Sequence, residues 1–271
     1  MKPAAFDYIR ADTGEEAVAA LNDYGEDARI LAGGQSLVAM LNMRLAKPSV
    51  IVDIMKADLG APDIQDDRLV VPATTTQADL IARRDLLESV PLLAEALPWV
   101  GHPQTRARGT ICGSLAHADP SAELPLILTI LGGALRLRGP NGVREVPAEA
   151  FFQAMMLTDC APDEMIEAAL FPLSPNGAFA EVGRRTGDFA IVACAALHED
   201  DETMLAIGGV NDTPIRRTWN GLDDGQMDDA LNELAWSLDA RSDLHATARY
   251  RRDLVRRLGR QTIEKAMQCA A

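Results

Sequence analysis

The sequence predicts an α+β fold with two domains, the first of them divided into two lobes. Over residues 1–55, short apolar runs alternate with helix-like stretches, which indicates a small α/β lobe. Residues 56–172 continue with further strand runs and helices and form the second lobe. After residue 172 the pattern changes, because three runs typical of antiparallel strands precede about 50 residues with helical spacing of apolar positions. Residues 173–271 are therefore expected to form a small C-terminal α+β domain.

The elements of the first lobe follow from apolar runs and from the residues that end them. Thr13 and Glu16 have the spacing of a capping box, which marks the start of a helix. Pro48 breaks the helical pattern before the next apolar run. The expected strands cover residues 6–9, 29–31 and 50–54, and the expected helices cover residues 13–21 and 37–45.

The second lobe shows the same kinds of signal. Thr76 and Asp79 resemble a capping box with Asp in place of Glu. Pro140, Asn141 and Gly142 give a turn signal between two runs that are expected to pair as a hairpin. A polar stretch, residues 56–68, precedes residues 69–76. The expected strands cover residues 134–138, 142–146 and 164–170, the expected helices cover residues 80–87 and 122–131, and a short apolar segment covers residues 92–97.

The C-terminal domain is expected to begin beyond Pro172, which ends a strand-like run. Residues 174–177, Ser-Pro-Asn-Gly, have the composition of a junction between domains. The expected strands of the antiparallel sheet cover residues 178–183, 190–197 and 204–210, and the expected helices cover residues 228–238 and 244–267.

Composition and charge exclude several classes of protein. A formal net charge of −14 argues against a general nucleic-acid or anionic-membrane binder, because both need positive charge at the contact. No run of about 18 apolar residues spans a bilayer, and residues 1–7 lack the apolar run of a signal peptide. The spacing of the four cysteines fits neither a disulfide framework nor an iron–sulfur or zinc site, and no other metal-ligand spacing is evident. We expect a soluble, cytoplasmic protein that holds no metal.

Two segments rich in small residues are candidates for ligand binding. In the first, an apolar run stops at Gly33 and Gly34, and Gln35 and Ser36 precede a helix. Paired glycines let a backbone approach a ligand closely, and amide groups at a helix start favour an anion. The alternative interpretation is an ordinary turn in which Ser36 is the helix N-cap. The second segment, residues 102–124, is rich in Gly, Ser and Ala and ends at a helix.

Together the two segments suggest a ligand with an anionic linker held between lobes. A dinucleotide fits this description, with its pyrophosphate against the loops. Neither segment is G-x-G-x-x-G or G-x-x-x-x-G-K-[ST], so a Rossmann or P-loop protein lacks support. Ser36 and Ser114 have no His/Asp arrangement beside them in the sequence that favours a nucleophile, so no catalytic side chain is expected.

Both small-residue segments resemble sequences of a known protein family. Residues 32–37 followed by 41–48 resemble the first flavin loop, and residues 109–125 the second, of the FAD-binding subunit of molybdenum hydroxylases. This family includes the medium subunits of carbon monoxide dehydrogenase and of bacterial xanthine, nicotine and related N-heterocycle dehydrogenases. Residues 184–190 and 246–252 resemble later elements of the same subunits, in the expected order. Cys112 is a departure, because the family usually has a second glycine there, and the side chain is expected to narrow the space near the pyrophosphate.

The resemblance implies a two-lobed FAD domain of the vanillyl-alcohol oxidase/p-cresol methylhydroxylase type, which binds FAD non-covalently. Donors to the pyrophosphate are implied in both loops, and two carboxylates are implied near the ribityl or ribose hydroxyls. Arg185 is implied near the flavin ring. The implied FAD-binding residues are Ala32, Gly33, Gly34, Gln35, Ser36, Leu37, Thr110, Ile111, Gly113, Ser114, Asp119, Glu123 and Arg185.

The resemblance also implies partners. A large subunit with a molybdenum–pterin cofactor hydroxylates the substrate, a small subunit carries two iron–sulfur clusters, and the FAD subunit passes electrons to an external acceptor. A dimer of such heterotrimers is the implied assembly. The alternatives are a free-standing flavin oxidase or reductase of the same fold, and a scaffold that has lost its flavin.

Other residues have two interpretations each. His117 either approaches the flavin or is a polar residue of the loop. Cys112 is either redox-active or a small buried thiol. The acidic run 223–229 is a solvated helix start. The arginines near the C-terminus either dock a partner or solvate a helix face; they are Arg249, Arg251, Arg252, Arg256, Arg257 and Arg260.

Overall fold

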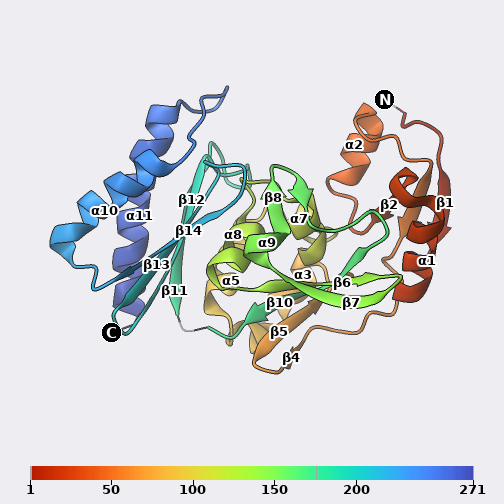
Figure 1. Cartoon of the computed structure of the whole chain (residues 1–271), viewed down its shortest axis with the longest axis horizontal. Coiled ribbons are helices and arrows are strands. Elements are labelled where there is room, and N and C mark those ends of the chain that lie inside the picture. The colour runs from red at the N-terminus through yellow and green to blue at the C-terminus, as the bar shows by residue number, and fades with distance from the viewer. Residues whose placement is uncertain (1, 175, 271) are drawn as a thin grey trace.

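Three bodies follow one another along the long axis of the molecule (Figure 1). This computed structural model describes residues 2–174 and 176–270, so Pro175, within the expected junction 174–177, lies outside the described residues. A small parallel sheet lies at one end, a five-stranded antiparallel sheet with its helices in the middle, and a four-stranded antiparallel sheet with two long helices at the other end. Within these described ranges, no helix has both the length and the apolar character needed to cross a membrane.

The first body is a three-stranded parallel sheet in which β3 lies between the other two strands. Thr13 Oγ1 accepts a hydrogen bond from Glu16 N at 3.1 Å and begins the first long helix, as the capping spacing predicts. The Glu16 carboxylate accepts a hydrogen bond from Asp12 N at 2.8 Å. In a standard capping box it would accept from Thr13 N, one residue later. The elements are β1 (Asp7–Arg10), α1 (Gly14–Tyr24), η1 (Gly25–Asp27), β2 (Ala28–Leu31), α2 (Leu37–Met43) and β3 (Val50–Asp53).

The second body contains an antiparallel sheet whose central strand is the last in sequence. Its strand order is β4 (Asp63–Gln65), β5 (Arg68–Pro72), β10 (Met165–Pro172), β6 (Ala134–Gly139) and β7 (Gly142–Pro147). The predicted hairpin is confirmed, with Gly139 paired to Gly142. Strand β5 covers the first part of the segment 69–76 and ends at Pro72, and β4 lies in a polar stretch that shows no strand pattern.

Helices of the second body pack on one face of this sheet. Thr76 Oγ1 accepts from Asp79 N at 3.0 Å, which confirms the second predicted cap. The predicted helix 80–87 is wrong as one element, because it divides at Arg83, whose backbone leaves the helical region with ψ 66°. The elements are α3 (Gln77–Ala82), α4 (Arg84–Leu87), α5 (Pro91–Ala96), η2 (Leu97–Trp99), α6 (Pro103–Arg106), α7 (Ile111–His117) and α8 (Glu123–Ile130).

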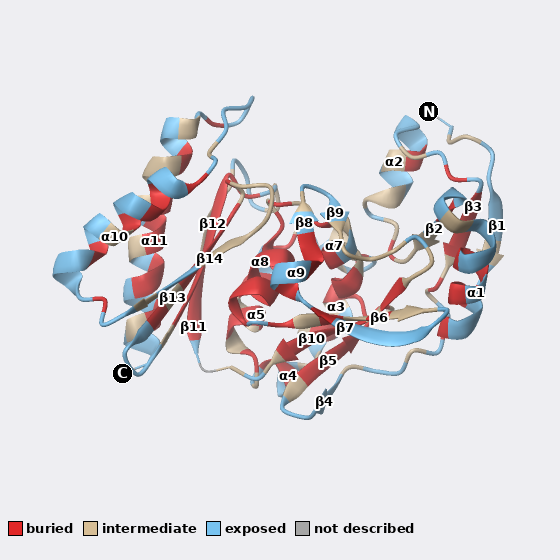
Figure 2. Ribbon diagram, in the orientation of Figure 1, coloured by how far each residue is buried: buried red, intermediate tan, exposed pale blue. Residues whose placement is uncertain are grey.

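Helix α8 is the buried centre of the molecule. Every residue from Glu123 to Ile130 is buried, and the helix contacts α5, α7, and strands of the four-stranded sheet (Figure 2). A helix that is apolar on all sides is expected where it is covered on all sides. Helix α8 therefore joins the second body to the third.

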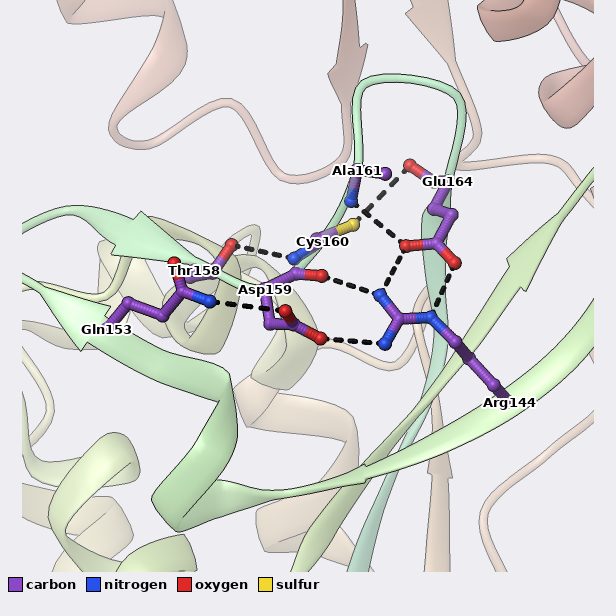
Figure 3. A network of polar contacts seen from close by, with 7 residues as sticks. All are labelled: Arg144, Gln153, Thr158, Asp159, Cys160, Ala161 and Glu164. Carbon is purple, nitrogen blue, oxygen red and sulfur yellow. Dashed lines mark hydrogen bonds and ion pairs between the residues drawn. The ribbon is translucent and has the colours of Figure 1, made fainter.

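A polar network fixes the segment that follows the hairpin. Arg144 on β7 donates to Glu164 Oε1 at 2.6 Å and to Asp159 Oδ2 at 2.7 Å, and Gln153 donates to the other Asp159 oxygen at 3.1 Å (Figure 3). The network fastens the small β8–β9 ribbon to the edge of the sheet. The elements involved are α9 (Ala148–Phe151), β8 (Phe152–Ala154) and β9 (Leu157–Thr158).

The third body has its own apolar core between a meander sheet and two helices. The strands are β11 (Gly177–Val182), β12 (Val192–Glu199), β13 (Glu202–Gly208) and β14 (Ile215–Asn220), and the helices are α10 (Asp224–Ser237) and α11 (Ala248–Ala270). The first three strands and both helices confirm the predictions to within a few residues. Strand β14 is an edge strand rich in polar residues and carries no apolar run, so the pattern misses it.

The arginines of α11 mostly make internal contacts. Arg251 is buried and donates to the Ile191 and Gly209 carbonyls at 2.5 and 2.7 Å, and it pairs with Asp243 at 2.6 Å. Arg260 pairs with Asp224 and Asp228 of α10. The acidic run 223–229 thus supplies ion-pair partners as well as a helix start, since Asp223 also caps α10. Arg252 and Arg256 also have partners within the chain, whereas Arg249 and Arg257 are exposed and keep both expected interpretations, docking and solvation.

Candidate functional site

The two small-residue segments meet at Gly33. A Cβ built on Gly33 would lie 2.7 Å from the Arg108 carbonyl carbon and 2.8 Å from Gly109 Cα, and closer still to the Arg108 carbonyl oxygen. Real carbon–carbon contacts lie at about 3.5–4.0 Å. Only glycine therefore permits this backbone-to-backbone approach, which joins segments far apart in the sequence. The sequence suggests that a glycine here allows close approach of a ligand, and the structure adds that it allows close approach of the chain to itself.

The segment after Gly33 presents a row of unused amide groups. Within the part of the chain that the structure describes, the backbone N–H groups of residues 33–36 donate no hydrogen bond to another group of the chain. Gly34 has φ +72°, a conformation that glycine adopts without strain. Ser36 occupies the N-cap position of α2, but its side chain makes no capping hydrogen bond. Capping by Ser36 is therefore the wrong explanation for these residues, and the amides remain as donors for an anion.

The second segment is largely helical, because α7 occupies the middle of it. Thr110 Oγ1 caps α7 by accepting from Gly113 N at 2.9 Å, and Ser114 N donates to Thr110 O at 3.2 Å. The amides of Gly113 and Ser114 are therefore satisfied within the helix, contrary to the expectation that they serve as donors. The hydroxyl groups of Thr110 and Ser114 remain as hydrogen-bond donors. Ile111 is buried, and its backbone N–H donates a hydrogen bond to Thr75 O at 3.2 Å.

Cys112 points away from the expected cofactor side. Its thiol is buried in the core and donates to the Val71 carbonyl on β5 at 3.5 Å. Burial raises the pKa of Cys112 to about 12, so the reactive thiolate is absent at neutral pH. The backbone has no positive φ at this position. The expectation that Cys112 narrows the space near the pyrophosphate is wrong, because the side chain faces the sheet, and its interpretation as a small buried thiol is confirmed.

The two expected carboxylates have different environments. Asp119 is half-buried, and its Oδ1 accepts from Ser121 N at 2.8 Å, which shapes the turn between α7 and α8. Glu123 is only 3% exposed at the first position of α8. Burial raises the pKa of Glu123 to about 7. His117 lies at the end of α7, so it belongs to a helix terminus.

Arg185 lies in the exposed turn between β11 and β12. The turn is packed against the second body through Gly187, where an added Cβ would meet the His102 ring at 2.6 Å. Gly187 has φ +85°, which favours glycine independently of the packing. This contact brings the turn next to the segment that leads into α6.

One residue of this region escaped prediction from the sequence. Glu181 on β11 is half-buried, and its Oε2 is buried with no hydrogen-bond partner among the described residues. Burial and the charge of Glu123 raise the pKa of Glu181 to about 8. A signal was present, because Glu181 shares a strand face with Phe179 and is the only charged residue of the strand, from Gly177 to Val182.

Two family models cover nearly all of the chain. Residues 4–174 match the model described as FAD binding domain in molybdopterin dehydrogenase, and residues 177–266 match the model described as CO dehydrogenase flavoprotein C-terminal domain. These matches confirm the α+β fold class, with an FAD-binding domain followed by a smaller C-terminal domain.

Curated relatives and a solved structure agree with these models. The chain is 36% identical over 288 residues to the 6-hydroxypseudooxynicotine dehydrogenase complex subunit alpha of Paenarthrobacter nicotinovorans, covering 100% of this chain and 97% of the relative. It is 33% identical over 283 residues to the carbon monoxide dehydrogenase medium chain of Afipia carboxidovorans, covering 98% of each. The structure of quinoline 2-oxidoreductase from Pseudomonas putida 86 matches with a TM-score of 0.94 and 32% identity, covering 100% of this chain and 99% of that one. The chain therefore belongs to the family of FAD-binding medium subunits of molybdenum hydroxylases.

Proposed function

We propose that the chain is the FAD-carrying electron-transfer subunit of a heterotrimeric molybdenum hydroxylase. The observation that supports this role most directly is the row of unused amides at residues 33–36, held in place by the contact of Gly33 with Arg108 and Gly109. Backbone donors of this kind bind the phosphates of a dinucleotide without needing a cationic surface. This matters in a chain whose net charge is −14.

The residues proposed to hold FAD fit its chemistry. Ala32, Gly33, Gly34, Gln35, Ser36 and Leu37 line the pyrophosphate from one side, and Thr110, Ile111, Gly113 and Ser114 support it from the other, where hydroxyls rather than amides donate. Asp119 and Glu123 are proposed acceptors for ribityl or ribose hydroxyls, and Arg185 is proposed to lie near the flavin ring. When bound, the flavin supplies reversible uptake of one or two electrons. The chain itself binds and orients it and sets its local hydrogen bonding.

The proposed partners follow from the family. A large subunit with the molybdenum–pterin cofactor hydroxylates a small substrate, and a small subunit with two iron–sulfur clusters delivers electrons to this chain. We further propose a dimer of heterotrimers, an external electron acceptor and a cytoplasmic location. The proposed division is an FAD-binding domain over residues 1–172, with lobes 1–55 and 56–172, and a C-terminal domain over residues 173–271.

A binding titration tests the cofactor assignment. The purified chain, freed of flavin, is titrated into FAD while flavin fluorescence is followed, and a one-to-one complex is expected. Flavin mononucleotide, which lacks the pyrophosphate, is expected to bind much more weakly. Equal affinity for both nucleotides, or no binding of either, would contradict the assignment.

Co-purification tests the assembly. A tagged chain isolated from its native host is expected to carry two further chains, together with molybdenum and iron in the same complex. A lone flavin-containing chain that oxidises a substrate without either metal would show that it is a free-standing enzyme.

A further inference from the structure

One pair of polar side chains bridges the first and second bodies. Between residues 2–55 and residues 63–172, the described part of the chain contains a single hydrogen-bonded contact, from Arg138 Nη1 on β6 to Glu15 Oε1 on α1 at 2.7 Å, which is also the single ion pair. Figure 1 shows the β6–β7 hairpin reaching α1, where this contact is made. The polar connection between the two bodies therefore depends on one arginine.

Arg138 is fastened to the second body before it reaches the first. Its Nε donates to Glu167 Oε1 on the central strand β10 at 2.8 Å, and its Nη2 donates to the same oxygen. The Glu167 side chain is only 16% exposed, whereas that of Glu15 is 72% exposed. Because a guanidinium is a rigid planar group with fixed donor directions, the bonds to Glu167 also fix the direction in which Nη1 meets Glu15. The pair thereby sets the position of α1 relative to β10.

The rest of this contact is apolar and does not fix an orientation by itself. Helix α1 packs on β6 and β10, and its buried residues belong to the same core as those of the sheet. Apolar attraction is non-directional. A Cβ built on Gly14 would lie 3.2 Å from Leu59 Cδ2 and 3.4 Å from Arg138 Cδ, so the stem of Arg138 packs beside the first turn of α1.

Open space lies on both sides of Arg138. A cavity of about 320 Å³ lies between α1 and the turn of the β6–β7 hairpin, and one of about 650 Å³ lies between residues 59–63 and the sheet. Among the described residues, Arg138 alone lines both cavities. The neighbourhood of the ion pair therefore leaves room for the first body to turn, and the ion pair is the polar restraint on that rotation.

We propose that Arg138 is a positioning residue for FAD, which through Glu15 holds the first body in the orientation at which residues 33–36 face Thr110 and Ser114. The two bodies also touch where Gly33 lies against the backbone of Arg108. That contact limits how closely the bodies approach, whereas the ion pair limits how they turn. The effect on FAD rests on the proposed function, in which the pyrophosphate lies between these two segments.

FAD affinity of four variants tests the role of the ion pair. Glu15→Ala and Arg138→Met each remove one partner, a double variant removes both, and Glu15→Arg places two cations together. An exposed ion pair contributes little, so Glu15→Ala is expected to raise the dissociation constant of FAD about two- to fivefold at low salt, and Glu15→Arg is expected to raise it further. Because Glu15 acts through Arg138, the double variant should bind FAD no more weakly than Arg138→Met alone.

Asp23→Ala is the matched control, because it removes one exposed carboxylate from the same helix, and it should leave FAD affinity unchanged. Salt separates electrostatic positioning from altered packing. At 1 M salt the Debye length falls to about 3 Å, so the dissociation constant for Glu15→Arg should approach that of the unaltered chain. A ratio of these two constants that does not change with salt overturns the proposal. So does a double variant whose loss of affinity is the product of the two single losses.

A distance measurement on the flavin-free chain gives a readout independent of FAD. Spin labels are attached at two exposed positions, Glu26→Cys in the first body and Glu88→Cys in the second, after the exposed Cys269 is replaced by serine. Pulsed EPR should give one narrow distance distribution, which Glu15→Arg broadens or shifts and Asp23→Ala does not. A distribution that Glu15→Arg leaves unchanged overturns the proposal. Failure of the unaltered chain to bind FAD contradicts the proposed function instead, and the distances still decide whether the ion pair orients the bodies.

Discussion

Replacing Gly33 with alanine is expected to damage FAD binding by separating two segments of the chain. The added methyl group would lie 2.7 Å from the Arg108 carbonyl carbon and 2.8 Å from Gly109 Cα. Ordinary carbon–carbon contact needs about 3.5–4.0 Å, so the segments must move apart by about 1 Å. The obstacles are backbone atoms, which no change of rotamer removes. Overpacking of this kind costs about 1–3 kcal/mol of folding free energy.

The effect on FAD is expected to exceed the effect on stability. A hydrogen bond of about 2.9 Å that lengthens by about 1 Å is lost. A hydrogen bond to a charged group is worth about 1.5–3 kcal/mol, so each lost amide–phosphate bond raises the dissociation constant of FAD roughly 10- to 150-fold. Fluorescence titration measures this constant, and thermal unfolding of the flavin-free chain measures the stability.

Gly225→Ala is the matched control. Gly225 lies in the first turn of α10, where the nearest atom to an added Cβ is Asp223 Oδ1 at 3.3 Å. This substitution is expected to leave FAD affinity unchanged. If the dissociation constant of FAD for Gly33→Ala lies within about threefold of that for the unaltered chain, no amide–phosphate hydrogen bond has been lost. If it also melts at the same temperature, the backbone contact itself is refuted.

Three further predictions concern the buried groups. In the native chain, a thiol reagent should modify the exposed Cys269 quickly and the buried Cys112 and Cys194 only on unfolding, so fast modification of Cys112 would contradict its burial. The pKa of Glu123 rises from its ordinary 4.5 to about 7 on folding, so the unaltered chain loses stability as the pH rises through that range. Glu123→Gln lacks this titration. In urea titrations, its free energy of unfolding relative to that of the unaltered chain should be up to about 3 kcal/mol higher at pH 8.5 than at pH 4. Arg251→Met should lower the free energy of unfolding by about 2–4 kcal/mol, whereas Arg257→Met, at an exposed position of the same helix, should change it by less than about 0.5 kcal/mol.

Much of the fold could be predicted because its signals are local. Thr13 and Thr76 cap helices that their own sequence neighbourhoods define, and the Pro140-Asn141-Gly142 turn sets a hairpin by itself. Strand β14 could not be predicted, since an edge strand needs no apolar run on its exposed side. Helix α7 was hidden for a different reason: its Gly, Ser and Ala residues have the composition of a loop, and only the Thr110 cap marks its start.

The candidate site divides in the same way. The glycines at 33 and 34 are visible as a break in an apolar run, but the contact of Gly33 with Arg108 joins residues that no local pattern relates. The burial of the unpartnered Glu181 Oε2 is also invisible in the sequence, because it depends on how β11 packs beside α5 and the rest of the second body. The family resemblance supplies the missing long-range information for FAD, and it supplies none for Glu181.

The central position of β10 has a consequence for the order in which the chain matures. Before Met165–Pro172 leaves the ribosome, β4–β5 and β6–β7 are two separate ribbons with no strand between them. Helix α7 packs on β10 and β5, so it lacks part of its support until then. Such long-range closure is slow relative to local folding. Cofactor loading is therefore expected to follow synthesis of roughly two-thirds of the chain, and fragments that stop before residue 165 are expected to aggregate rather than bind FAD.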